Sequence, residues 1–233
     1  MRHTDYNDTV LCARCDSQRV LLIPRYFILW LAQSKLSIMS ASFVSYFGYG
    51  SLVNRDTRPP TEEAINVTLQ GWRRVWNHRV VNSDARRACT SLSIEPADGV
   101  IDGVLVRIPT SELAALDERE SGYERLQLDA SHFILPERVT DDVIHVYRSL
   151  GKNRILADHE HPVTQSYVDC VMAGYASRFG DSGLQQFLQS TRGWECPMVA
   201  DRDDPNYPRS VELPSKQLGY FDSLLARLRQ ASD

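Results

Sequence analysis

Two short segments contain the residue types that acid–base chemistry on a small anionic substrate requires. The first is the run 46–52, YFGYGSL, where apolar strand-forming residues lead into a turn containing Gly48 and Gly50. Glycines let the backbone bend and approach a ligand closely, so such a turn can aim successive N–H groups at an anion. The second is the run 117–123, DERESGY, with acidic residues at the end of an expected helix. An anion cradle plus a carboxylate suits a substrate that carries both a carboxylate and an amine.

Both segments resemble signatures of the gamma-glutamylcyclotransferase superfamily, which includes AIG2-like and ChaC-like proteins. The residues Tyr49-Gly50-Ser51-Leu52 match the family's Tyr-Gly-Ser loop. The run 116–123, LDERESGY, matches the form Leu-Asp-x-x-Glu before a glycine and an aromatic residue, which holds the family's catalytic glutamate. The resemblance covers about residues 42–213 and implies that Glu120, rather than Glu118, is catalytic.

The resemblance also implies a fold, a reaction and further site residues. The fold is α+β, a small mixed β-barrel, closed or nearly closed, with flanking helices. The reaction releases 5-oxoproline and a free amine from a γ-glutamyl amide, without a cofactor or metal. Substrate-binding roles fall on Tyr49, Gly50, Ser51 and Leu52 at the turn, and on Tyr123 in the pocket wall. Tyr147 is a further candidate for that wall.

A carboxyl group that serves first as base and then as acid needs a pKa near neutrality, which burial can provide. Asp117 would raise the pKa of Glu120 further if it were close and ionised. Glu118 is expected to be solvated.

Other clusters of reactive residues lack the context their chemistry needs. His159-Glu160-His161 precedes Pro162 in a polar stretch, so a solvated loop is expected rather than a metal site. The acidic run 201–204 lacks the glycine and terminal glutamate of a calcium loop. A cysteine hydrolase would pair Cys89 or Cys170 with His78 or His145, but neither cysteine lies in a recognisable nucleophile motif. Ser51 lacks the glycines of a serine nucleophile elbow.

Composition excludes several classes of function. The 233 residues, 42% apolar and 24% charged, suit one globular domain. A net charge of -4 gives no basis for nucleic-acid binding. The pairs Arg73-Arg74 and Arg86-Arg87 are interpreted as solvated charge on a sheet edge. Five cysteines without a framework spacing indicate a reducing compartment, and a soluble cytoplasmic protein is expected.

The first 41 residues have no counterpart in the resemblance, so the domain boundary is placed at 41/42. The apolar run 20–32 is interrupted by Pro24 and Arg25 and is too short to span a bilayer. We expect Met39 to be the initiator and residues 1–38 to be dispensable; the alternative is an interfacial anchor. A C-x-x-C at Cys12 has no second pair at zinc-ribbon spacing, which favours a chance occurrence.

The remaining elements follow from hydrophobic periodicity. A capped helix is expected from Thr110 to Glu120, and further helices after Pro162, around residues 184–188 and over 220–228. Strands are expected in the order of the chain, with Gly71 separating the second from the third and a turn at 96–99 separating the next two. They are 43–49, 64–70, 72–81, 89–94, 100–108, 123–128 and 143–147.

Two classes of function stay open at this level. One is a γ-glutamyl cyclotransferase, with a glutathione-specific ChaC-like enzyme as a narrower form. The other is a binding protein of the same fold that holds a small molecule without catalysis. The identity of the γ-glutamyl substrate, the oligomeric state and the strand order do not follow from the sequence.

Overall fold

The computed structural model describes residues 42–59, 63–80, 86–137, 139 and 143–230, and these belong to one compact unit. The expected extension, with Cys12 and Met39, lies outside the described residues, as does Val81 at the end of an expected strand.

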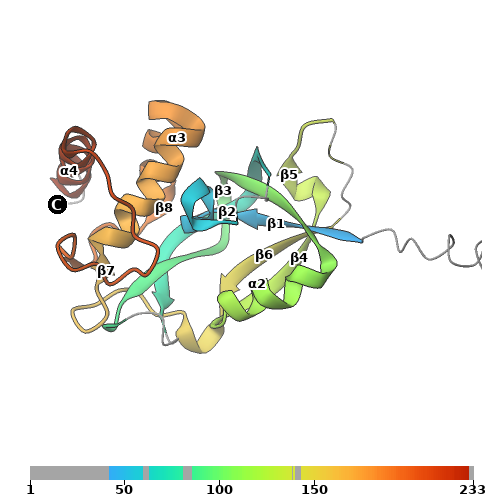
Figure 1. Cartoon of the computed structure of the whole chain (residues 1–233), viewed down its shortest axis with the longest axis horizontal. Helices are drawn as coiled ribbons and strands as arrows, with labels where there is room; N and C mark the ends of the chain where they lie inside the picture. Colours follow the sequence, from blue (N-terminus) through green and yellow to red (C-terminus); the bar gives the residue numbers. More distant parts are fainter. Residues whose placement is uncertain (1–41, 60–62, 81–85, 138, 140–142, 231–233) are drawn as a thin grey trace, which may run out of the picture. The chain divides into compact units, whose positions relative to one another are not determined.

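A curled mixed sheet forms the centre of this unit (Figure 1). Its main path follows the order β4-β6-β1-β3-β2-β5, and the short strands β7, β8 and β9 pair along its sides. The strands are β1 (Phe43–Gly48), β2 (Ala64–Arg79), β3 (Thr90–Pro109), β4 (Tyr123–Asp129), β5 (Phe133–Ile134), β6 (Val143–Ser149), β7 (Val163–Thr164), β8 (Thr191–Arg192) and β9 (Met198–Val199).

The first strand lies in the interior of this sheet. It pairs antiparallel with β3 and parallel with β6, and Tyr46 and Phe47 near its end are each 1% exposed. Because hydrogen bonds on both sides fix this strand, the turn that follows it starts from a rigid support.

The strands β2 and β3 form a long antiparallel pair, longer than the sequence predicts. The predicted breaks at Gly71 and at residues 96–99 are wrong, because both strands continue through them. The register shifts between Gln70 and Trp72, where Gly71 has a φ of 80°, so these residues form a bulge. A bulge keeps the ladder going while it bends the strand, which helps the sheet to curl.

The ladder follows an open path rather than a closed ring. Within the described ranges, β4 and β5 stand at its two ends and do not pair with each other. The expectation of a closed or nearly closed barrel is therefore corrected to a curled half-barrel.

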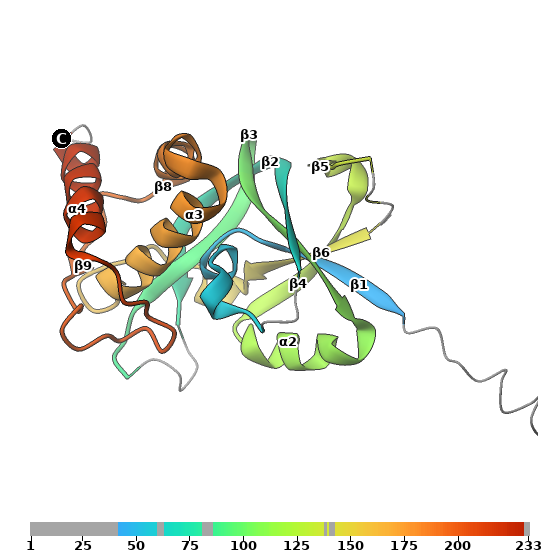
Figure 2. The same cartoon turned by 45° about the horizontal axis from the view of Figure 1, so that its top comes forward.

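Within the described residues, three α-helices flank the sheet: α2 (Leu113–Arg119), α3 (Gln165–Ser190) and α4 (Ser215–Gln230). A 3-10 turn over Thr110–Glu112 begins α2, close to the predicted start, but the predicted cap is wrong because no described side chain caps either the turn or the helix. The long helix α3 is interrupted at Gly180, with a φ of 68°, so a second segment follows as predicted. The helices α3 and α4 lie together, whereas α2 lies apart from them along the sheet (Figures 1 and 2). Among the described residues, no helix combines the length and the apolar composition that a bilayer crossing requires.

Candidate active site

The glycine turn after β1 is held by its carbonyl groups. The carbonyl oxygen of Gly50 accepts from the Val53 N–H at 3.0 Å, and that of Ser51 accepts from Asn54 N–H and Thr57 Oγ1. Ser51 and Leu52 begin a 3-10 helix, and the first N–H groups of a helix have no partner within it. A Cβ at Gly50 would lie 2.9 Å from Tyr167 Oη, so a larger residue here would have to displace the Tyr167 side chain.

The fully buried Arg74 binds a carbonyl group of the turn. Arg74 Nε donates to the Tyr49 carbonyl oxygen at 3.1 Å, and Tyr175 Oη lies 2.9 Å from the same oxygen. The guanidinium also donates to Ser190 Oγ and the Asp102 carbonyl oxygen, and it lies 4.9 Å from the Tyr175 ring centroid.

The interpretation of both arginines of the 73–74 pair as solvated charge is therefore wrong for Arg74. It holds for Arg73, whose side chain is 42% exposed and bound to Glu95. Arg86 and Arg87 are also exposed, as predicted, and both form ion pairs with Asp204.

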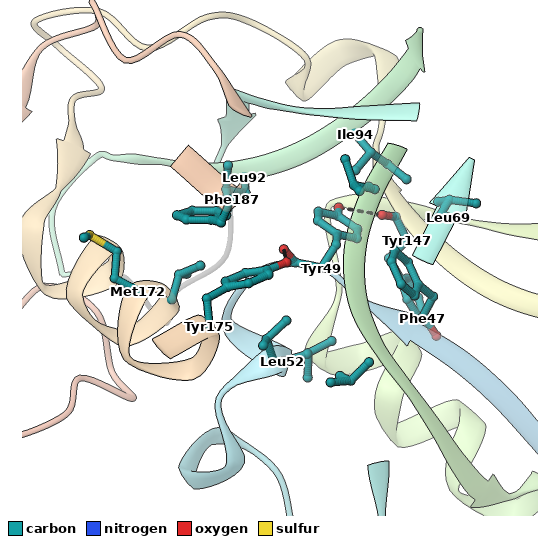
Figure 3. Packing of buried hydrophobic residues seen from close by; sticks show 14 of the residues in the cluster. Phe47, Tyr49, Leu52, Leu69, Leu92, Ile94, Tyr147, Met172, Tyr175 and Phe187 are labelled. Carbon is teal, nitrogen blue, oxygen red and sulfur yellow. Dashed lines mark hydrogen bonds between the residues drawn. The ribbon is translucent and has the colours of Figure 1, made fainter. Parts of the chain in front are cut away.

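Tyr49 is packed between the sheet and α3 (Figure 3). Its hydroxyl donates to the Tyr147 carbonyl oxygen at 2.7 Å, and its side chain is buried. Burial raises the pKa of this hydroxyl further above its ordinary value. The buried ring, held by its hydroxyl, is therefore fixed beside the glycine turn.

The end of α2 positions Glu120. Its N–H donates to the Leu116 carbonyl oxygen at 2.9 Å, and its carbonyl oxygen accepts from the Tyr123 N–H at 2.9 Å. Gly122, with a φ of 113°, then turns the chain into β4. The glutamate is thus fixed on both sides, by a helix and by a strand.

The surroundings of Glu120 favour its protonated form. The side chain is 16% exposed, and burial raises the pKa of Glu120 above its ordinary value of 4.5. Arg119 and Arg209 act in the opposite direction, with Arg119 Nε 3.4 Å from Glu120 Oε1. The net shift is upward because removal from water outweighs the two positive charges.

The other carboxylates near this helix end do not share that environment. Asp117 accepts from Tyr147 Oη and from Arg125 Nη1, each at 2.6 Å, and it is not among the groups that shift the pKa of Glu120. The condition under which Asp117 would raise the pKa of Glu120 is therefore not met, and burial is the cause of the shift. Glu118 is exposed, as predicted.

One cavity, with a volume of about 120 Å³, brings the predicted site residues together. Glu120, the turn 49–52 and Tyr123 all line it, and so does Tyr147. Sequence reasoning did not assign several other residues to this wall. They are Phe47, Gly48, Val80, Thr90, Ser91, Leu92, Arg119, Thr164, Tyr167 and the run 206–209, together with His78 and Cys89.

The tyrosine hydroxyls around the cavity remain protonated at neutral pH. Burial raises the pKa values of Tyr123 and Tyr167 well above 10.0, and that of Tyr207 to about 12. Tyr123 Oη donates to the Leu92 carbonyl oxygen at 2.8 Å, and its ring stacks on His78 at 3.7 Å. These hydroxyls can therefore act as hydrogen-bond donors and fix the wall.

The loop 201–209 completes the cavity, and it is the feature that sequence reasoning missed. Its acidic residues suggest only a poor calcium loop, whereas its end contributes Asn206, Tyr207, Pro208 and Arg209 to the wall. Trp194 is buried, 5.1 Å from Trp76 between ring centroids, and does not line the cavity.

Cys89 and His78 share the cavity, but their state does not suit a cysteine hydrolase. Burial raises the pKa of the Cys89 thiol to about 11 and lowers that of His78 to about 4. His78 Nδ1 lies 2.9 Å from Ser149 Oγ. A protonated thiol beside a histidine engaged elsewhere is a weak nucleophile. Within the described part of the chain, no three His, Cys, Asp or Glu side chains are grouped to hold a metal ion.

Sequence comparisons add no family assignment: no protein-family model matches the chain, and no curated protein matches it. Solved structures do match. YkqA from Bacillus subtilis matches with a TM-score of 0.50 at 18% identity, over 72% of this chain and 60% of that one. A gamma-glutamyl cyclotransferase matches with a TM-score of 0.49 at 15% identity, over 78% and 99%. A yeast gamma-glutamyl cyclotransferase specific to glutathione has a TM-score of 0.40 at 17% identity, over 81% and 100%.

The predicted α+β class is confirmed, as a curled half-barrel with flanking helices, and YkqA shares this fold. At these identities the likeness concerns the fold alone.

Proposed function

We propose that this protein is a γ-glutamyl cyclotransferase that releases 5-oxoproline and a free amine from a γ-glutamyl amide. The observation that carries the proposal is the shared cavity of the turn 49–52 and Glu120, a carboxyl group whose pKa is raised by burial. A site that only binds a zwitterionic glutamyl group would not need a carboxyl group with a raised pKa.

The reaction is intramolecular, so positioning supplies much of the rate. The α-amine of the substrate attacks its own γ-carbonyl carbon, a new C–N bond closes the five-membered ring, and the amide C–N bond breaks. The nucleophile is already tethered, and the cavity has to hold a folded conformer in which amine and carbonyl meet. The wall of Tyr49, Tyr123 and Tyr147 supports this because hydrogen bonds fix each of them.

Glu120 would handle both protons. As a carboxylate it takes one proton from the α-ammonium group so that the free amine can attack, and as an acid it gives that proton to the leaving nitrogen. The attacking nitrogen loses a second proton as the ring closes, and the same carboxylate passes this proton to the released amine, which leaves as an ammonium ion. The proton count balances without water or a co-reactant. A raised pKa makes the carboxylate a stronger base for the first transfer, and general acid–base catalysis of this kind contributes on the order of 10²–10⁴-fold.

The turn would bind the glutamyl end. The N–H groups of Ser51 and Leu52 would donate to the substrate carboxylate or to the oxygen on which negative charge develops. Arg74 stabilises the opposite, carbonyl side of the turn, which leaves the N–H side for the ligand. The rival function, binding without catalysis, would use the same turn but would not depend on Glu120.

Incubation with a panel of γ-glutamyl compounds tests the proposal. The panel contains γ-glutamyl amino acids, γ-glutamylamines and glutathione, and the readout is 5-oxoproline. Release of 5-oxoproline with an equal amount of amine is expected from at least one member. Tight binding of a panel member without any 5-oxoproline would favour the binding protein instead, and turnover of glutathione alone would favour the narrower ChaC-like activity.

A further inference from the structure

The charge of the cavity suggests what kind of amine the substrate carries. Among the described residues that line it, the ionised side chains at neutral pH are Arg119, Arg209 and, when deprotonated, Glu120. His78 is neutral because burial lowers its pKa to about 4. The cavity wall therefore has a net charge of about +1, and +2 when Glu120 holds a proton.

Arg119 is already engaged. Its Nη1 donates to the Thr57 carbonyl oxygen at 2.8 Å, and its Nε lies 3.4 Å from Glu120 Oε1. It helps to fix the end of α2 beside the turn, which limits its freedom to bind a ligand.

Arg209 differs from Arg119 in this respect. Within the described residues it forms no hydrogen bond or ion pair, although its charge acts on Glu120 and Tyr207. A partly buried guanidinium that faces a cavity and has no anionic partner of its own is suited to bind a carboxylate from a ligand.

The loop that carries Arg209 is held firmly in place. The buried Asp201 carboxylate accepts from Ser166 N–H at 2.7 Å, Ser166 Oγ at 2.6 Å and Asn206 N–H at 2.8 Å. The Asn206 side chain donates to the Arg87 carbonyl oxygen and accepts from the Arg87 N–H. Tyr207 then packs edge-on against Tyr167 at 4.9 Å. Arg209 is therefore presented to the cavity from a rigid loop.

The charges of the possible substrates differ. The glutamyl end of any γ-glutamyl amide is a zwitterion with no net charge, which leaves the positive wall uncompensated. A leaving amine that is itself an amino acid or peptide adds one carboxylate, whereas an alkylamine adds none. We propose that Arg209 binds a carboxylate on the amine portion of the substrate, so that the preferred substrates are γ-glutamyl amino acids or peptides. This inference rests on the proposed function.

Two substrates of similar size test it. The ratio of kcat/KM for γ-glutamylalanine to that for γ-glutamylethylamide is measured in the wild type and in Arg209→Gln at one pH. The substitution also removes a charge that acts on Glu120, but that effect is common to both substrates and cancels in the ratio. We expect the wild type to prefer γ-glutamylalanine, and the ratio to fall about tenfold or more in Arg209→Gln.

Two further variants complete the design. Arg209→Lys keeps the charge and should retain most of the preference. Arg227→Gln removes an exposed arginine from α4, outside the cavity wall, and should leave the ratio unchanged. An equal loss for both substrates in Arg209→Gln would place Arg209 at the glutamyl end and overturn the inference, while 5-oxoproline release would still support the proposed function.

A binding measurement separates the two proposals if catalysis is absent. Calorimetric titration of both compounds into Glu120→Gln should give tighter binding of γ-glutamylalanine, and Glu120→Gln/Arg209→Gln should lose that difference. Equal affinities in Glu120→Gln would overturn the inference. Absence of 5-oxoproline from the wild type, with the preference in binding intact, would contradict only the proposed reaction.

Discussion

The pKa of Glu120 is raised although the residue stands at a helix end, a position where carboxylates are usually solvated. The helix has seven residues, and Glu118, two positions earlier, is solvated. The chain turns at Gly122 into β4, and Tyr123 and the end of the loop 201–209 line the same cavity as Glu120. Removal from water then outweighs the attraction of Arg119 and Arg209, so the pKa of Glu120 moves upward.

The raised pKa predicts a pH-dependent cost in stability. The folded state binds the Glu120 proton more tightly than the unfolded chain, so the free energy of unfolding falls as pH rises from the ordinary value of 4.5 through the folded-state pKa. Glu120→Gln removes this cost. Relative to the wild type, it should become more stable as pH rises from 4 to 8, measured as the denaturation midpoint in urea.

Glu118→Gln is the matched control for that titration, since the same substitution on an exposed side chain should show little pH dependence. A wild-type advantage over Glu120→Gln that grows with pH would mean that the pKa of Glu120 is lowered instead.

At the scale of elements, β2 carries two adjacent arginines, of which Arg73 is exposed and Arg74 is buried. Arg73 lies on the exposed side of the strand and pairs with Glu95, whereas Arg74 points into the interior and holds the Tyr49 carbonyl. Successive side chains on a strand face opposite sides, so this alternation follows from the strand itself. Which side is buried depends on what packs against it, here Tyr175 from α3.

Replacement of the two arginines should separate these roles. Arg74→Met leaves the Asp102 carbonyl and other buried groups with fewer partners, and should lower the free energy of unfolding by about 1–3 kcal/mol or more. It should also lower kcat/KM because the turn loosens. Arg73→Gln should cost about 0–1 kcal/mol, as exposed ion pairs do. Equal costs in chemical denaturation would contradict the assigned role of Arg74.

The strands of the sheet show which features can be predicted from the sequence and which cannot. The positions of β1, α2, β4 and β6 followed from hydrophobic periodicity, since that signal is local. The continuity of β2 through Gly71 did not, because a glycine marks a turn or a bulge equally well, and the partner strand decides between them. The short strands β5, β7, β8 and β9 carry two residues each and have no periodicity to detect.

At the scale of the whole molecule, the site joins segments that lie far apart in the sequence. The motifs predicted its turn and its glutamate, whereas nothing local indicated that the loop 201–209 closes over them. The acidic residues of that loop suggest a calcium site, and the sequence pattern fits such a site poorly. One of them, Asp201, instead binds the start of α3 and fixes the loop.

Asp201→Asn should therefore act on a site that it does not line. The amide replaces one acceptor oxygen with a donor among three donors, which should cost about 1–3 kcal/mol and raise KM because the loop loosens. Asp203→Asn is the control, since Asp203 is exposed on the same loop. Thermal unfolding and steady-state kinetics measure both effects. An unchanged KM in a destabilised Asp201→Asn would show that the loop does not contribute to substrate binding.

The central claim is that Glu120 exchanges protons with a γ-glutamyl substrate held at the turn 49–52. Single-turnover release of 5-oxoproline by Glu120→Gln, compared with the wild type and with Glu118→Gln, tests it most directly. We expect Glu120→Gln to lose at least about 10²-fold in rate while it keeps its fold and its substrate affinity, and Glu118→Gln to react like the wild type. Wild-type release of 5-oxoproline by a folded Glu120→Gln protein would contradict the account.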